Sequence, residues 1–235
     1  MRKILVGIPH LQFSRTEFER SLLNTLEKSD IIIDDKDINY ECIVMDLIGN
    51  ITDDARNIVC ARAINEDFTD VFFLDDDMLH PRFTLHDLLI HRNDNEIVIG
   101  GMYTNKIGTR IHAYDYRDGI FYPMILKPNT GLHKCDAVAS GCMLIPTSIL
   151  KKISFPWFYY KYTEISETYK KSATITLGDK YYAHWSEDTV FCHNVKKAGF
   201  DVYVDSNINC YHLTTMAIGL NDDGQISFNM LREMT

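Results

Sequence analysis

The chain has 235 residues, 46% of them hydrophobic and 24% charged, so it can bury a core and is not an intrinsically disordered sequence. Lys and Arg number 24 against 33 Asp and Glu, and the net charge of −9 gives no overall attraction to nucleic acid or to an anionic membrane. No apolar run reaches the roughly 18 residues that a membrane-spanning helix needs.

Apolar periodicity in the first hundred residues predicts alternating strands and helices. Pro9 is expected to end the first strand, because proline cannot donate a ladder hydrogen bond. The alternation predicts right-handed crossovers and one α/β domain with a mostly parallel central sheet flanked by helices. The expected elements are strands at 3–8, 40–47, 71–74 and 96–102 and helices at 16–28, 53–66 and 83–91.

The second half of the chain has a less regular pattern. Ser186 suits a helix N-cap, with Glu187 and Asp188 in the first turn and Gly199 just beyond the end. Residues 155–183 combine an aromatic cluster with a polar stretch of weak periodicity, and we expect them to order as a lid over a bound ligand. The other expected elements are a β-rich excursion at 104–131, strands at 135–145, 201–204 and 208–211, and helices at 147–153 and 186–198.

The six cysteines are dispersed, and none forms a C-x-x-C pair with another. Most lie within apolar stretches, which is typical of reduced core residues rather than of a disulfide framework or a zinc site. The apolar run in Met1 to Pro9 is too short for a signal peptide. We therefore expect a cytoplasmic protein, or one of the host cytoplasm if the chain is viral.

The chain is organised around Val71 to Met78, where four apolar residues are followed by Asp75, Asp76 and Asp77. Adjacent carboxylates at the end of a buried strand repel one another, and a divalent metal is the simplest compensation. Ligands also usually bind beyond the carboxyl ends of the strands in an open α/β sheet. The alternative is a solvated acidic turn before a helix.

Four motifs, in this order, resemble those of nucleotide-sugar-dependent glycosyltransferases of the GT-A fold, family 2-like and non-processive. Ala55-Arg56-Asn57 is similar to the Ala-Arg-Asn helix of these enzymes, and Val71 to Met78 resembles their Asp-x-Asp strand. Residues 139–146 resemble the strand that floors the acceptor site, and residues 186–212 resemble the Glu-Asp helix, the Ala-Gly-Tyr turn and the C-terminal metal-binding His.

Two departures stand beside this resemblance. Cys192-His193-Asn194 occupies the place where many members carry an Arg after the Glu-Asp pair, and no Gln-x-x-Arg-Trp motif follows. These departures argue against the processive polysaccharide synthases.

The resemblance implies transfer of a sugar from a nucleotide-diphosphate sugar, with a UDP-sugar favoured, to an acceptor hydroxyl. Mn²⁺ or Mg²⁺ would neutralise the departing diphosphate, and an imidazole ligand favours Mn²⁺. The implied metal ligands are Asp75, Asp77 and His212, and the implied donor-binding residues are Pro9, Arg56, Asn57, Asp75, Asp76 and Lys106. Taken singly, Arg56 and Lys106 are equally well explained as surface charges, and His212 as an ordinary core or surface residue.

An inverting enzyme also needs a base, and the resemblance implies Asp188, with Glu187 as the alternative. Both acids are equally typical of residues that complement a helix dipole. The implied acceptor-binding residues are Ser140, Gly141, Trp157 and Tyr159, although the aromatic cluster around Trp157 could simply fill the core. The acceptor could be a glycan, a protein, a lipid or a modified nucleic acid.

The whole chain, 1–235, is then one GT-A domain: residues 1–103 bind the nucleotide sugar, residues 104–212 bind the acceptor, and residues 213–235 form a tail. A phosphatase of the haloacid dehalogenase type is a rival, but Leu79 stands where that family needs Thr or Val. A sugar-nucleotide pyrophosphorylase would need a Gly-rich loop where Pro9-His10-Leu11-Gln12 stands. A non-catalytic glycan-binding module with the same fold is the non-enzymatic alternative.

Overall fold

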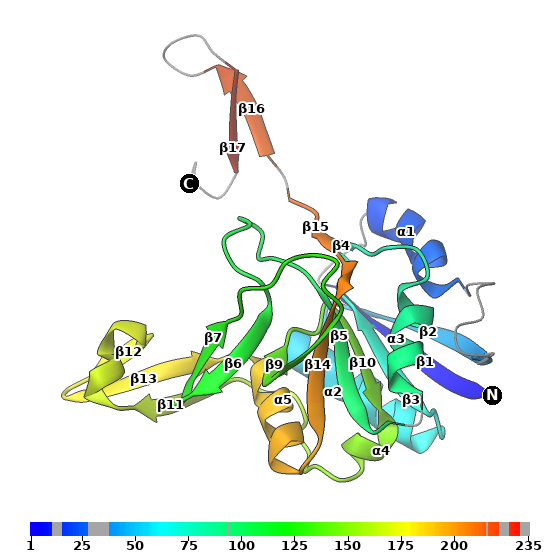
Figure 1. Cartoon of the computed structure of the whole chain (residues 1–235), viewed down its shortest axis with the longest axis horizontal. Coiled ribbons are helices and arrows are strands. Elements are labelled where there is room, and N and C mark those ends of the chain that lie inside the picture. Colours follow the sequence, from blue (N-terminus) through cyan, green and yellow to red (C-terminus); the bar gives the residue numbers. More distant parts are fainter. Residues whose placement is uncertain (11–15, 28–37, 94, 215, 221–225, 231–235) are drawn as a thin grey trace.

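A seven-stranded sheet lies at the centre of the computed structural model, which describes residues 1–10, 16–27, 38–93, 95–214, 216–220 and 226–230 (Figure 1). Its spatial order is β2 (Tyr40–Ile48), β1 (Arg2–His10), β3 (Asp70–Leu74), β10 (Cys142–Pro146), β5 (Ile97–Met102), β14 (Asp201–Asn209) and β8 (Leu132–Cys135). The β1–β2, β1–β3 and β5–β14 pairs are parallel, whereas β10 and β8 are antiparallel to their neighbours. The prediction of a mixed α/β fold with a mostly parallel sheet is confirmed.

Helices cover both faces of this sheet. Side chains alternate along each strand, so Leu5 and Phe73 pack in one core cluster while Val6 and Phe72 pack in the other. The first cluster is covered by α2 (Thr52–Asn65), α4 (Thr147–Leu150) and α5 (Glu187–Lys197), and the second by α1 (Thr16–Leu26) and α3 (Thr84–Arg92). Lys28, the expected end of α1, lies outside the described residues.

Strand β1 continues through Pro9 and His10, so the expected strand end at residue 8 is wrong. The pairing of β1 with β3 stops at Gly7 and Phe73, whereas its pairing with β2 continues to His10. Beyond Gly7 the strand therefore has a neighbour on one side only, where proline is tolerated. The extension carries His10 to the carboxyl edge of the sheet.

The expected strand at 135–145 is divided among three strands, of which β8 and β10 belong to the central sheet and β9 to a smaller one. Strand β8 ends at Cys135, β9 (Ala137–Val138) pairs with β6 (Ala113–Arg117), and β10 returns to the central sheet. Strand β6 forms a hairpin with β7 (Ile120–Pro123) through Asp118 and Gly119, whose φ angles of 52° and 85° suit a two-residue turn. This hairpin is the β-rich excursion that the sequence predicted.

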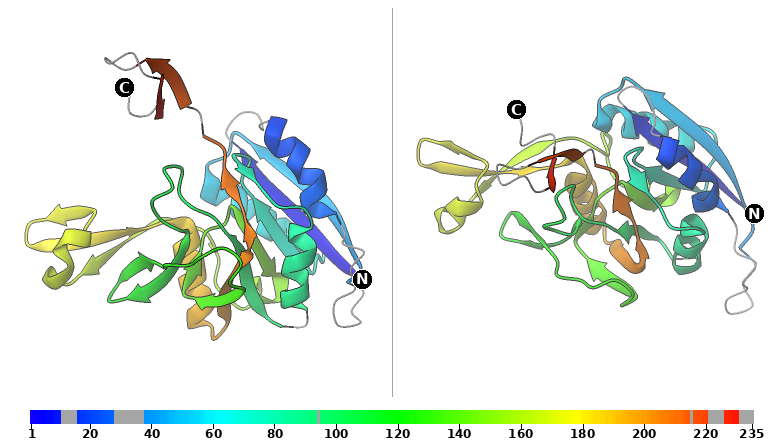
Figure 2. Two further views of the ribbon diagram at one scale, coloured as in Figure 1. Left: turned by 45° about the horizontal axis from the view of Figure 1, so that its top comes forward. Right: turned by 90° about the horizontal axis from the view of Figure 1, so that it is seen from above.

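A three-stranded antiparallel sheet projects from the side of the domain next to this hairpin (Figures 1 and 2). This β-arm contains β11 (Lys161–Ile165), the 3-10 helix η1 (Glu167–Ser172), β12 (Ile175–Leu177) and β13 (Lys180–Trp185). The weak periodicity of residues 155–183 therefore gave no indication of these strands. Hydrophobic periodicity is weak here because most arm side chains are exposed, and only Ile165, Ala183 and Trp185 enter a small core cluster.

Two short strands form a sheet of their own that brings His212 beside the acidic motif. Strand β15 (Tyr211–His212) pairs with β4 (Met78–Leu79), so His212 stands opposite Met78, directly after the acidic motif. Within residues 213–235, expected to be an irregular tail, β16 (Met216–Leu220) and β17 (Ile226–Met230) pair as a hairpin. In the described part of the chain, no helix has the length and apolar character needed to cross a membrane.

Candidate active site

The acidic motif begins where β3 leaves the sheet, and Asp75 is fixed there by two contacts. Its backbone N–H donates to the Gly141 carbonyl at 3.2 Å, and its Oδ1 accepts from Arg56 Nη2 at 2.8 Å. Burial raises the pKa of Asp75, and repulsion from Asp77 and Asp188 adds to this effect, while Arg56 and His212 oppose it. Asp77, Asp188 and His212 are therefore close enough to Asp75 for their charges to affect its pKa.

Arg56 joins the two halves of the site from beneath. It lies on the face of α2 that packs against the sheet and is 2% exposed. Its Nη2 contacts Asp75, and its Nη1 donates to Glu187 Oε1 in a very short contact. Because its guanidinium group is covered and paired on both sides, Arg56 positions two acids, and the predicted direct contact with a nucleotide does not fit this burial.

The two acids at the start of α5 have different surroundings. Glu187 is 7% exposed, contacts Arg56 and is hydrogen-bonded by the Tyr160 hydroxyl. Burial raises the pKa of Glu187 to about 7, with repulsion from Asp188 adding to the shift and Arg56 opposing it. Asp188 is only partly buried, and its Oδ1 accepts from the Thr189 N–H at 2.8 Å and from the Ser186 hydroxyl.

The predicted metal ligands are Asp77, in the turn before β4, and His212, on β15, and both are held by contacts with other groups. Asp77 Oδ2 forms an ion pair with Lys106, and the Asp77 carbonyl accepts from the Leu213 N–H at 2.7 Å. His212 Nδ1 contacts the Thr104 carbonyl, which can only accept, so Nδ1 carries the proton and Nε2 keeps its lone pair. This arrangement is typical of an imidazole oriented for metal binding.

The charges around the motif suit a divalent cation. Two permanent cations, Arg56 and Lys106, are paired with Asp75, Glu187 and Asp77, and Asp76 and Asp188 add further negative charge. Carboxylate oxygens with one imidazole are ligands that Mn²⁺ and Mg²⁺ accept, with the imidazole favouring Mn²⁺. Asp75, Asp77 and His212 therefore offer the kinds of ligand atom that such an ion binds.

A cavity of about 170 Å³ opens beside the motif at the carboxyl edge of the sheet. It is lined by Pro9, His10, Asn50, Thr52, Asp75, Asp76 and Asp77, which brings three of the predicted donor-binding residues together. His10, Asn50 and Thr52 were not predicted. His10 is 7% exposed, and its ring nitrogens lie 3.6 Å from Asp76 Oδ2 and 3.8 Å from Asp46 Oδ1. The sequence signal that could have found His10 was its place just beyond the expected first strand, whose carboxyl end lies at this edge of the sheet.

Asn57 holds the aromatic segment 155–158 against α2. Its Oδ1 accepts from the backbone N–H groups of Trp157 and Phe158 at 3.0 and 3.1 Å, and its Nδ2 donates to the Phe158 carbonyl at 2.7 Å. Both ends of the amide are thus used within the protein. The predicted contact of Asn57 with a nucleotide does not fit these bonds.

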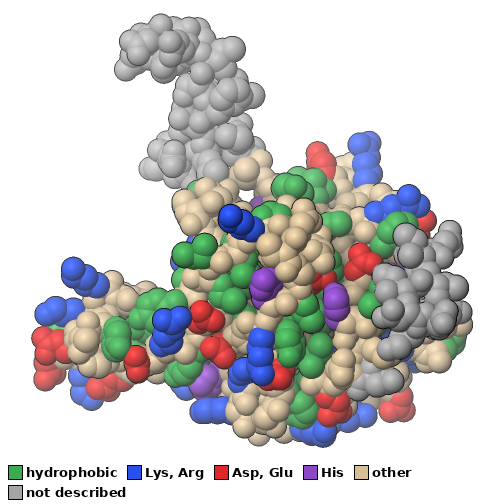
Figure 3. Space-filling view, viewed as in Figure 1, with side chains coloured by type: hydrophobic (Ala, Val, Ile, Leu, Met, Phe, Trp, Pro, Cys, Tyr) green, Lys and Arg blue, Asp and Glu red, His purple; other side chains and the backbone are tan. Residues whose placement is uncertain are grey.

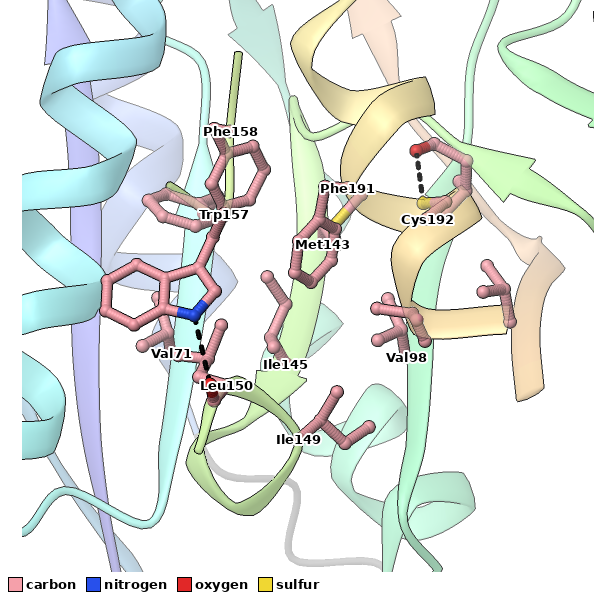
Figure 4. Close-up of a cluster of buried hydrophobic side chains, with 14 of the residues drawn as sticks. Val71, Val98, Met143, Ile145, Ile149, Leu150, Trp157, Phe158, Phe191 and Cys192 are labelled. Atoms are coloured by element: carbon pink, nitrogen blue, oxygen red, sulfur yellow. Dashed lines mark hydrogen bonds between the residues drawn. The ribbon is translucent and has the colours of Figure 1, made fainter. Parts of the chain in front are cut away.

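Trp157 lies in the hydrophobic core (Figure 4). It is 8% exposed and its Nε1 donates to the Leu150 carbonyl at 3.0 Å, while the neighbouring Phe158 stacks on Phe191 with ring centroids 4.5 Å apart. This burial contradicts the predicted role of Trp157 as an aromatic face for the acceptor. Tyr159 is half-buried and lines a separate groove along α2.

Ser140 and Gly141 lie behind the acidic motif rather than on an open floor. Ser140 is 1% exposed, and Gly141 donates its N–H to the Tyr103 hydroxyl at 2.9 Å. A Cβ at position 141 would stand 2.7 Å from the Tyr103 hydroxyl and 2.9 Å from Asp75 Oδ2. Glycine is therefore needed for the close approach of this strand to Asp75.

A groove of about 440 Å³ leads from the outside to the start of α5, between the β6–β7 hairpin and the β-arm. Trp185 of the arm packs edge-on against Phe121 of the hairpin with ring centroids 5.1 Å apart, which fixes the two walls together. The groove ends at Ser186 and Thr189, the residues that bond Asp188. Its lining includes Tyr114, Phe121, Tyr122 and Trp185, none of which was predicted.

The fold is similar to the GT-A-like fold of solved glycosyltransferase structures. The chain resembles the crystal structure of A197 from STIV, with a TM-score of 0.57 and 18% identity over 97% of this chain and 94% of that chain. It also resembles GalNAc-T7 solved with UDP, GalNAc and Mn²⁺, with a TM-score of 0.54 and 12% identity over 90% of this chain and 44% of that chain. S. aureus TarS matches with a TM-score of 0.46, 16% identity and coverage of 90% and 36%.

No family model matches the sequence, and no curated protein matches it. At these identities the structural neighbours establish the fold, and the activity has to be argued from the site.

Proposed function

We propose that the protein is a metal-dependent glycosyltransferase that moves a sugar from a nucleotide-diphosphate sugar, most readily a UDP-sugar, to an acceptor hydroxyl. The observation that carries this proposal is the meeting of Asp75, Asp77, Asp188 and His212 at the carboxyl edge of the sheet. These residues come from three distant segments; a cavity opens beside Asp75 and Asp77, and a groove ends at Ser186 and Thr189, which bond Asp188. The likeness of the fold to GalNAc-T7, solved with UDP and Mn²⁺, supports the same conclusion.

The donor is assigned to the cavity beside the acidic motif, with Pro9 and His10 against the nucleotide. Asp75, Asp77 and His212 would hold Mn²⁺ or Mg²⁺, which supplies positive charge for the departing diphosphate. We assign Lys106 to the phosphates, since its ammonium group already lies against the carboxylate of Asp77. Arg56 keeps Asp75 and Glu187 in place from beneath.

Asp188 is assigned as the base that takes the proton of the acceptor hydroxyl. The acceptor oxygen bonds to the anomeric carbon as the bond to the diphosphate breaks, and the diphosphate leaves with the bonding electrons. Asp188 is preferred to Glu187 because Asp188 is more exposed and adjoins the groove, whereas Glu187 is buried against Arg56. A carboxylate anchored by a backbone N–H and a hydroxyl is well positioned for this proton transfer.

The acceptor is assigned to the aromatic groove, which suits a sugar-bearing molecule because aromatic faces bury the apolar faces of sugar rings. On the face drawn in Figure 3, among the residues described there, Lys and Arg are interspersed with Asp and Glu. Such a face offers no continuous basic track for nucleic acid, so a glycan or a glycosylated protein or lipid is the preferred acceptor.

The proposal is tested by a thermal-shift screen of UDP-, GDP- and CDP-sugars with and without Mn²⁺. A ligand that binds the folded state stabilises it by about 2.7 kcal/mol at a hundredfold excess over its Kd. We expect such stabilisation by one nucleotide class, and only when metal is present. Asp77→Asn should lose this stabilisation, and Asp179→Asn, in an exposed turn of the β-arm, is its matched control. Stabilisation without metal, or by no nucleotide sugar, would contradict the proposal.

A further inference from the structure

A second cluster of metal-binding side chains lies behind the acidic motif. His80, Cys142 and Cys210 each offer one ligand atom, and these atoms all lie within 4.8 Å of one another. The three residues are 6%, 0% and 3% exposed, and they come from the segment after β4, the start of β10 and the link from β14 to β15. This set is different from the predicted ligands Asp75, Asp77 and His212.

The His80 ring is held in an orientation that leaves one nitrogen available. Its Nε2 lies 2.9 Å from the Gly141 carbonyl, which can only accept, so Nε2 carries the proton and Nδ1 has the free lone pair. Nδ1 is buried and has no hydrogen-bond partner among the described residues, which is costly for a polar atom. A ring nitrogen bound to a backbone carbonyl while the other stays free is typical of a metal-ligating histidine.

The two sulfur atoms are adjacent and share a space that a larger residue would fill. The Cys210 and Cys142 thiols are hydrogen-bonded to each other. A Cβ at Gly101 would lie 2.9 Å from Cys142 Sγ, 3.2 Å from Cys210 Sγ and 2.8 Å from a methyl group of Ile208. Glycine at position 101 therefore keeps the space beside both sulfur atoms open.

We propose that His80, Cys142 and Cys210 bind a zinc ion at a structural site distinct from the Mn²⁺ or Mg²⁺ site. Two thiolates and a neutral imidazole balance the charge of Zn²⁺, so the complex is neutral overall and suits an apolar interior. Each cysteine releases its proton when the metal binds. Two sulfur atoms about 2.3 Å from one zinc ion lie roughly 3.8 Å apart in a tetrahedral site, so the cluster needs little movement.

Such an ion would join the segments that carry the proposed catalytic metal ligands. His80 follows Asp77 by one short strand, and Cys210 precedes His212 in the chain. The Gly141 carbonyl accepts from both His80 and the Asp75 backbone N–H, so the acidic motif shares a contact with the cluster. Zinc at this position would hold β4, β10 and β15 together behind the active site.

The test is a cobalt titration of the full chain after treatment with a chelator and a reductant, together with zinc analysis of the protein as purified. We expect one equivalent of zinc and, with Co²⁺, a thiolate-to-cobalt charge-transfer band and the strong visible bands of a tetrahedral site. Cys142→Ser and Cys210→Ser should lose these bands. Cys192→Ser should keep them, because Cys192 is a buried cysteine outside the cluster.

Asp77→Asn should also keep the charge-transfer band, because carboxylate ligands give no thiolate charge transfer. This result would separate the zinc site from the proposed catalytic metal site. If the serine variants do not fold, the spectrum of the unaltered chain still decides the question. Absence of zinc together with absence of a charge-transfer band in the unaltered, reduced chain would overturn the proposal. So would an unchanged band in folded Cys142→Ser.

Discussion

The two walls of the candidate active site are built in different ways. The proposed donor wall consists of strand ends, with Pro9 and His10 at the end of β1 and Asp75 to Asp77 after β3. The proposed acceptor wall consists of the β6–β7 hairpin and the β-arm, which are fixed by contacts such as that of Trp185 with Phe121. Parallel strands bring their carboxyl ends to one edge whatever their side chains are, whereas the position of a hairpin depends on how particular side chains pack.

The largest effect should come from Asp188, which lies between the two walls. In Asp188→Asn the amide keeps the shape and can still accept the Thr189 N–H, but it cannot take a proton. We expect turnover to fall by roughly two to four orders of magnitude while donor affinity persists. Steady-state kinetics with calorimetric donor binding measures both quantities, and Asp179→Asn is the control. Turnover within a few-fold of the unaltered enzyme would make Glu187 the base or would indicate a retaining mechanism.

The next largest effect should be a loss of stability in Trp157→Ala, which tests whether Trp157 is a core residue or an acceptor-binding one. Trp157→Ala removes a buried side chain and its hydrogen bond to Leu150, so the free energy of unfolding should fall by about 3 to 5 kcal/mol. Phe155→Ala, at a position that is 68% exposed, is the control and should change it far less. Urea unfolding gives both values. If Trp157→Ala left stability unchanged but raised the acceptor KM, Trp157 would belong to the acceptor wall after all.

Glu187 should make stability depend on pH in a defined direction. Its pKa is about 7 in the folded protein against an ordinary 4.5, so between these values the folded state holds a proton that the unfolded state has lost. This contribution to stability is complete below about pH 4.5 and is lost as the pH rises through 7. Thermal unfolding in metal-free buffer should show this loss, and Glu187→Gln should remove it. An equal pH dependence in both proteins would refute the assignment.

The smallest effect should come from the acceptor wall itself. Tyr122→Ala removes one aromatic side chain of the groove, and an aromatic contact worth about 0.5 to 1.5 kcal/mol corresponds to an acceptor KM raised roughly two- to tenfold. Donor affinity should not change. Tyr162→Ala, an exposed tyrosine of the β-arm outside the groove lining, is the control. Equal acceptor KM values for the two variants would remove the acceptor from this groove.

The sequence predicted the parts of the molecule whose signals are continuous along the chain. The buried strand that leads to Asp75 and the helix after Ser186 lie where they were expected, although the Ser186 side chain makes no capping hydrogen bond. The order of β-α units predicted a mostly parallel sheet, because the crossover rule leaves few other arrangements.

The sequence could not predict features that depend on neighbours in space. Pro9 was expected to end a strand, but the strand has lost its neighbour on one side at that point. The β-arm has little hydrophobic periodicity because both of its faces are largely exposed. Trp157 is a residue type that is common in binding sites, but its position in the fold places it in the core. Cys142 and Cys210, expected to be separate core thiols, meet only because β10 and the end of β14 converge.

The central claim is that the acidic edge binds a nucleotide through a metal ion, and calorimetric titration of UDP with and without Mn²⁺ tests it most directly. We predict binding by the unaltered chain only in the presence of Mn²⁺, with the heat lost in Asp77→Asn and retained in Asp179→Asn. Asp77→Asn should otherwise fold normally, because Asp77 lies in a partly exposed turn. Equal UDP affinity with and without Mn²⁺, or undiminished affinity in Asp77→Asn, would contradict the account.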